Sequence, residues 1–179
     1  MTGSRTIAGS QLFVVSRRKK SSGYRDPNFI SEHRGGPLKM REHRLLARWA
    51  ADCAEHVLTI VWKNSKDRRP FDAVEKARAW ARGEVVVGEA MKAAVAAHAA
   101  ARACNDPAAI AAARAAGHAV ATAHMADHCF GVGYALRAID HAGLDMEKER
   151  RWQEQRLPKA VRELVHAGRE YRLKQGRAF

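Results

Sequence analysis

The chain has 179 residues, enough for one domain with a real core plus an appendage, and 46% hydrophobic with 28% charged residues predicts a folded protein. No apolar run approaches the roughly 20 residues that a membrane-spanning helix needs, and residues 12–15 are too short an apolar segment for a signal peptide. Cys53, Cys104 and Cys129 form no CxxC pair, which excludes a disulfide framework and favours a cytoplasmic location.

The net charge of +13 is concentrated at the two ends of the chain. Residues 1–39 carry eight basic and two acidic side chains, and residues 147–179 carry ten and five. Residues 40–146 carry fourteen and twelve, so the central part is close to neutral. We therefore expect any weak polyanion binding to come from the basic termini, and we expect no membrane partner.

Residues 1–37 are rich in Ser, Gly, Arg and Lys and end in Gly35-Gly36-Pro37. This composition predicts a flexible basic N-terminal arm with a short strand at residues 12–15. Two alternatives stay open, namely an arm that contacts nucleic acid and an extension without a function that precedes a natural start at Met40.

A helical period begins at Met40, and residues 38–173 are expected to form the folded domain. The first apolar stripe consists of Leu45, Leu46, Trp49, Cys53, Val57, Ile60 and Val61. Residues 64–67 interrupt the period. A second helix is predicted over residues 69–82, with Asp67 as a cap, Pro70 in the first turn and Gly83 at the end.

A third helix is predicted from about residue 86 to residue 104, and Asn105-Asp106-Pro107 ends it and begins the next one. A single helix over residues 107–142 would be about 54 Å long at 1.5 Å per residue, too long for a domain of this size. We therefore predict two helices, one from Pro107 to about residue 126 and one ending at His141, with the break near Gly131 and Gly133.

Alanine accounts for 20 of the 37 residues from 90 to 126, which secures the helices locally. Small residues four apart let two helix backbones approach closely. We expect two smooth faces to meet, one made of Ala90, Ala94, Ala97 and Ala101 and the other of Ala113, Gly117 and Ala121.

The remaining segment predicts a polar helix over residues 147–156 that bears Trp152, then a last helix opened by Pro158. Residues 174–179 are expected to fray. The predicted fold class is all-α, a single-domain bundle of six to seven helices with an alanine-rich, close-packed central pair.

Four histidines are the best candidates for chemistry. His124 and His128 are four residues apart, so on one helix their rings would be neighbours and could hold a metal ion. His118 lies about 80° from His128 around such a helix, and His98 could face the group from the third helix. A metal site, a structural polar cluster and catalytic acid/base chemistry all remain open for these histidines.

No other pattern completes a catalytic site. GEVVVG at residues 83–88 is no phosphate loop, no GxSxG is present, and Glu84 and Glu89 are too far apart around a helix for paired-carboxylate chemistry. We therefore expect neither a cofactor nor an enzymatic activity. Trp80 and Trp152 are candidates for partly exposed anchors of an interface.

Six segments resemble a bacterial family, the immunity-protein-five-like domain of polymorphic toxin systems. They are WAADCAEHVL (49–58), ARAWARGE (77–84), GEAMKAAVAAHAAARA (88–103), AARAAGHAVATAHMADH (112–128), YAL (134–136) and RWQ…LP (151–158). The resemblance covers about residues 41–160. Its recurring positions in this chain are Trp80, Arg82, Gly88, Glu89, Gly117, His118, His124 and His128.

The resemblance implies an all-helical, non-enzymatic protein that binds and neutralises a cognate toxin in the cytoplasm. The strongly basic chain departs from the acidic face that inhibitors of nucleases often present, which favours an acidic or non-nuclease partner. The alternatives are a nucleic-acid-associated helical protein, a metal-dependent protein that uses the histidines, and a structural protein that forms homo-oligomers.

Overall fold

The computed structural model of the chain describes residues 25–177, so the expected strand at residues 12–15 and the last two residues lie outside the described part. Within it the structure is all-helical, as predicted, and apart from one isolated bridge between Ser31 and Leu38 it has no β-structure. The seven α-helices are α1 (Met40–Asn64), α2 (Arg69–Arg82), α3 (Val87–Arg102), α4 (Pro107–Ala121), α5 (Val132–His141), α6 (Met146–Arg156) and α7 (Lys159–Lys174). Three short 3-10 helices are η1 (Pro27–Phe29), η2 (Glu32–Arg34) and η3 (Ala126–Gly131).

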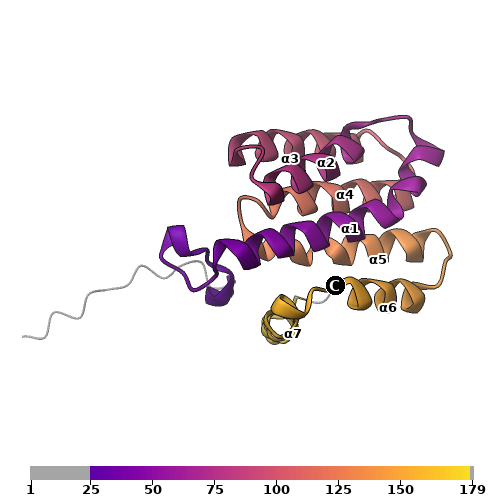
Figure 1. The fold of residues 1–179 in the computed structure, drawn as a ribbon. Coiled ribbons are helices and arrows are strands. Elements are labelled where there is room, and N and C mark those ends of the chain that lie inside the picture. The colour runs from indigo at the N-terminus through magenta and orange to yellow at the C-terminus, as the bar shows by residue number, and fades with distance from the viewer. Residues whose placement is uncertain (1–24, 178–179) are drawn as a thin grey trace, which may run out of the picture.

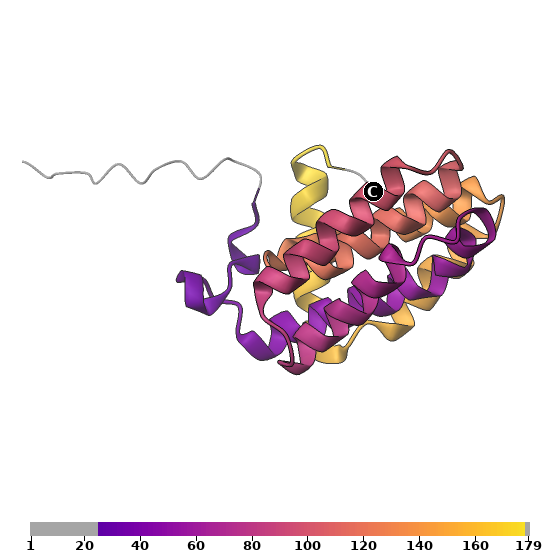
Figure 2. The same ribbon diagram turned by 90° about the horizontal axis from the view of Figure 1, so that it is seen from above.

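The helices form three layers, with α2 and α3 on one side, α1 and α4 in the middle, and α5 and α6 on the other side (Figure 1). α7 crosses the others steeply beside the start of α1 (Figures 1 and 2). None of the helices between residues 25 and 177 has the length and apolar character needed to cross a membrane.

α4 is the central helix, because it packs against α1, α2, α3 and α5. Most of its side chains are buried, and nearly all of these are alanine. Small side chains let four neighbouring helices approach one axis closely. The predicted contact with the third helix is confirmed, since α3 buries Ala90, Ala94, Ala97 and Ala101 and packs on α4.

Local sequence signals set most helix ends where they were predicted. Gly83 ends α2 with a φ of 83°, a left-handed conformation that glycine adopts without strain. The Asp106 carboxylate accepts a hydrogen bond from the backbone N–H of Ala109 and so caps α4. The prediction of two helices within residues 107–142 is confirmed, but their break is not at Gly131 and Gly133. α4 ends at Ala121, a turn follows, and η3 leads into α5.

The expectation of a flexible arm up to residue 37 is wrong for residues 25–37. This N-terminal segment, residues 25–39, is folded onto the bundle, with Phe29 fully buried and Leu38 2% exposed. The Phe29 ring lies 5.0 Å from the ring of Phe130 and contacts α7 at Gly168. The prediction was wrong because it rested on the mostly polar composition of the segment, whereas Phe29 and Leu38 alone are enough to anchor it.

Candidate functional site

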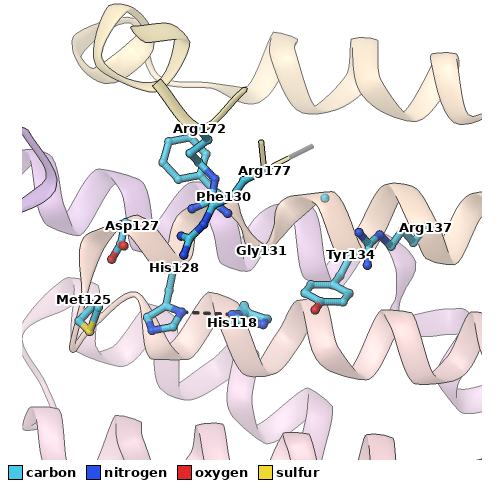
Figure 3. A pocket seen from close by; sticks show the side chains of 11 residues that line it. His118, Met125, Asp127, His128, Phe130, Gly131, Tyr134, Arg137, Arg172 and Arg177 are labelled. Atoms are coloured by element: carbon cyan, nitrogen blue, oxygen red, sulfur yellow. Dashed lines mark hydrogen bonds between the residues drawn. The ribbon is translucent and has the colours of Figure 1, made fainter. Parts of the chain in front are cut away.

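Three of the four candidate histidines converge at the junction of α3, α4 and η3. His98 comes from α3, His118 from α4 and His128 from η3. The Nδ1 atoms of His118 and His128 are 3.2 Å apart, and the rings of His98 and His118 meet edge to face at 5.1 Å. Tyr134 of α5 stacks on the other side of His118, with ring centroids 5.0 Å apart (Figure 3). We call His98, His118 and His128 the histidine cluster.

Two glycines make room for these rings. A Cβ atom at Gly117 would lie 2.6 Å from Cε1 of His98, and one at Gly131 would overlap the side chain of His118. Gly117 was predicted to let two helices approach closely, and it also leaves space for the His98 ring against the backbone of α4.

The histidine cluster is uncharged at neutral pH. Burial, with smaller contributions from the neighbouring His128 and His98, lowers the pKa of His118 to about 3. Burial also lowers the pKa of His98 and of His128. Between two neutral imidazoles, one Nδ1–H donates to the other Nδ1, which accounts for the contact between His118 and His128.

His124 does not belong to the cluster, so the predicted pairing of His124 with His128 on one helix is wrong. α4 ends at Ala121, and the chain turns between the two histidines. The Nδ1 atom of His124 instead accepts a hydrogen bond from Arg34 of η2, at 3.3 Å. The same turn brings together His118 and His128, which a continuous helix would have kept on different faces.

The described residues contain no group of three or more His, Cys, Asp or Glu side chains arranged to hold a metal ion. The two nitrogens that lie closest together, Nδ1 of His118 and Nδ1 of His128, are within hydrogen-bond distance of each other. A structural zinc site in a protein usually has four ligands, and a catalytic one has three plus water. The geometry of the cluster therefore fits hydrogen bonding better than metal binding.

The histidine cluster borders a cavity of about 360 Å³. Figure 3 shows His128 and His118 beside it, with Arg172 and Arg177 reaching in from the side of α7. The Arg172 guanidinium lies 5.0 Å from the centre of the Phe130 ring, and Arg137 lies 5.1 Å from that of Tyr134. The cavity therefore has a cationic and aromatic lining.

His43 is a buried histidine that the sequence interpretation did not single out. Its Nε2–H donates to the carbonyl of Thr122 at 2.6 Å, so its Nδ1 accepts from the Ser31 hydroxyl at 2.9 Å. His43 is fully buried and Ser31 is 2% exposed, so no substrate reaches this serine–histidine pair. The pair joins the N-terminal segment to the end of α4. The sequence could have indicated that His43 is buried, because it lies three residues before Leu46 and therefore on the apolar face of the same helix.

The two cysteines in the core are not nucleophiles either. Burial raises the pKa of Cys53 and of Cys129, so both stay protonated thiols at neutral pH. They act as small apolar core residues.

The other residues singled out in the sequence lie at separate places. Trp80 is only 6% exposed and packs edge-on against His43, so it is part of the core and does not serve as an exposed anchor. Arg82 forms an exposed ion pair with Glu84 at 2.6 Å. The Glu89 carboxylate accepts a hydrogen bond from the backbone N–H of Val86 and so caps α3. Nothing packed around Gly88 requires a glycine there.

Trp152 of α6 is half-buried, and its ring stacks on His56 of α1 at 3.8 Å. His56 also contacts the carboxylate of Glu149, which is 3% exposed, at 2.7 Å. The contact of His56 with Trp152 and Glu149 was not predicted from the sequence. Apart from Trp152, α6 is mostly polar, so no periodic pattern indicates that Glu149 faces inward. Whether Trp152 anchors an interface stays a prediction.

The comparison with protein families gives one match, to the Imm-5 like putative immunity protein family, over residues 36–160. No curated protein and no solved structure matches the chain. The match spans α1 to α6 and includes the histidine cluster and the arginines of α1 and α2. Because it covers well over half of the sequence, the chain belongs to the Imm-5 like family of putative immunity proteins.

Proposed function

We propose that this protein binds a cognate bacterial toxin in the cytoplasm and neutralises it by covering a surface of that toxin, with no chemistry of its own. The observation that carries the proposal is the family match over residues 36–160. The site geometry is consistent with it, because the histidines of the cluster are neutral, His118 and His128 are hydrogen-bonded to each other, and both buried thiols are protonated.

The charge of the chain favours an acidic partner. A net charge of +13 attracts acidic surfaces and repels basic ones, which steers association and selects against wrong partners. An acidic toxin would therefore associate faster with this protein than a basic toxin would, and the rate would fall as salt is added.

Co-expression tests this proposal. The protein encoded beside the gene for this chain is taken as the candidate toxin and is expressed in a bacterial host, with the chain or with the same transcript carrying an early stop codon. We expect growth to be restored only by the intact chain, and the two proteins to purify together. Growth arrest in the presence of abundant folded chain, with no complex recovered, would contradict the proposal.

A further inference from the structure

A groove with a mostly cationic lining runs between α1 and α2. It encloses a cavity of about 470 Å³, lined by Arg44, Leu45, Arg48 and Asp52 of α1 and by Arg78, Ala81 and Arg82 of α2, so that four arginines face one carboxylate. We call it the arginine groove. Nothing in the fold requires four arginines to gather at one place, and like charges this close repel each other.

Two of the four arginines are already neutralised. Arg78 donates to Asp52 at 2.6 Å and to both carboxylate oxygens of Glu55 at 2.7 Å, which raises its pKa and fixes its side chain. Arg82 donates to both carboxylate oxygens of Glu84. The two ion-paired arginines line the groove on the α2 side.

Arg44 and Arg48 have no such partners. No hydrogen bond or ion pair within the described residues 25–177 involves either guanidinium. Arg44 lies against the end of α2, where a Cβ atom at Gly83 would be 3.2 Å from its Nη2 atom. The two side chains are four residues apart and so project one turn apart from the same face of α1, and Leu45 lines the groove to one side of them.

We infer that the arginine groove is the surface that receives an acidic segment of the toxin, with carboxylates of the toxin pairing with Arg44 and Arg48. This inference rests on the proposed function, and its argument is charge complementarity. Side chains one helical turn apart are about 5–6 Å apart at Cβ, so two Asp or Glu residues four apart on a toxin helix match them. An apolar side chain between those acids would meet Leu45 and Ala81.

A protein segment fits this groove better than nucleic acid does. Glu55 and Glu84 have side chains 57% and 53% exposed and lie among the arginines. Duplex DNA presents a negative charge about every 1.7 Å along its axis, so a bound duplex would also face these carboxylates. A peptide can place its carboxylates only where the arginines are.

The test compares two double variants with the same loss of charge. Arg44→Ala/Arg48→Ala removes the unpaired arginines, and Arg150→Ala/Arg151→Ala removes two exposed arginines of α6 as a matched control. Each purified full-length variant, checked for an unchanged melting temperature, is titrated with the candidate toxin and, separately, with a short DNA duplex. We expect the first pair to weaken toxin binding at least about tenfold at low salt and the control to change it about twofold or less.

The outcomes separate the two proposals. Equal weakening by both pairs, or unchanged toxin binding by the first pair, would overturn the assignment of the groove while leaving the immunity function intact. Loss of duplex binding in place of toxin binding would make the groove a nucleic-acid surface and overturn the inference. A wild-type chain that does not bind the toxin at all would refute the proposed function itself.

Discussion

At the scale of single residues, the histidine cluster depends on two glycines, one in α4 and one at the end of η3. Gly117 and Gly131 lie where any larger residue would meet an imidazole ring. Alanine is otherwise the better helix former, and about 1 kcal/mol separates it from glycine in a helix interior. The glycine at position 117 of α4 is therefore explained by the ring that it accommodates.

Gly117→Ala should destabilise the wild-type protein, because the new Cβ would lie 2.6 Å from the His98 ring. Overpacking of this kind typically costs about 1–3 kcal/mol. In a His98→Ala background the same change should instead stabilise the protein by up to about 1 kcal/mol. The measurement is a double-mutant cycle of unfolding free energies in urea. Additive effects of the two substitutions would contradict the contact.

His118 should make stability depend on pH. In the unfolded chain it takes up a proton as the pH falls below its ordinary pKa of 6.5, whereas in the folded protein it does so only near pH 3. Unfolding therefore takes up a proton between these values, and the stability present at neutral pH is lost as the pH falls through this window. The slope is about 1.4 kcal/mol per pH unit for each such proton.

Urea unfolding between about pH 7 and about pH 5 isolates this effect, because most carboxyl groups titrate below that range. The free energy of unfolding should fall with pH in the wild type and fall less steeply in His118→Asn. Equal slopes in the two proteins would show that His118 titrates normally in the folded state.

At the scale of elements, the N-terminal segment is a structural part of the bundle. Phe29 is fully buried between Phe130 and α7, and the Ser31 hydroxyl donates to His43. Two 3-10 helices hold these side chains in place, with the Asp26 carboxylate accepting from the backbone N–H of Asn28 in the first of them. The segment thereby closes the end of the bundle where α1 begins.

Phe29→Ala should lower the free energy of unfolding by about 3–5 kcal/mol, the usual effect of truncating a buried phenylalanine. Asn28→Ala is the matched control, because the neighbouring Asn28 side chain is exposed. Thermal and urea unfolding of both variants measure the effect. Equal stability of the two variants would mean that residues 25–39 do not pack on the bundle in solution.

The sequence predicts elements well where a residue type has a local effect. The second helix was predicted at residues 69–82 and lies there, because Gly83 ends it by its own backbone preference. The end of α4 was not predictable, since no glycine or proline stands at residues 122–125 and the turn is held by distant contacts such as that of His43 with the Thr122 carbonyl. The histidine cluster depends on that turn. The sequence could therefore indicate which histidines were candidates, but not that His128 would contact His118 and leave His124 outside the cluster.

At the scale of the whole molecule, the basic side chains add little to the stability of the fold. Exposed pairs such as Arg82 with Glu84 contribute little to stability, typically below about 1 kcal/mol. The unpaired Arg44 and Arg48 contribute no ion pair within the described residues. The charge of these two arginines therefore has no role in holding the described fold together, which agrees with the binding role proposed for them.

Neutralisation by binding is tested most sharply by a titration of the toxin's own activity. The candidate toxin of the co-expression experiment is purified and assayed with increasing amounts of the full-length chain at low salt. We expect toxin activity to fall linearly and vanish near one equivalent of chain, and Arg44→Ala/Arg48→Ala to shift the curve to higher concentration. Toxin activity that persists undiminished in a large excess of folded chain would contradict neutralisation by binding.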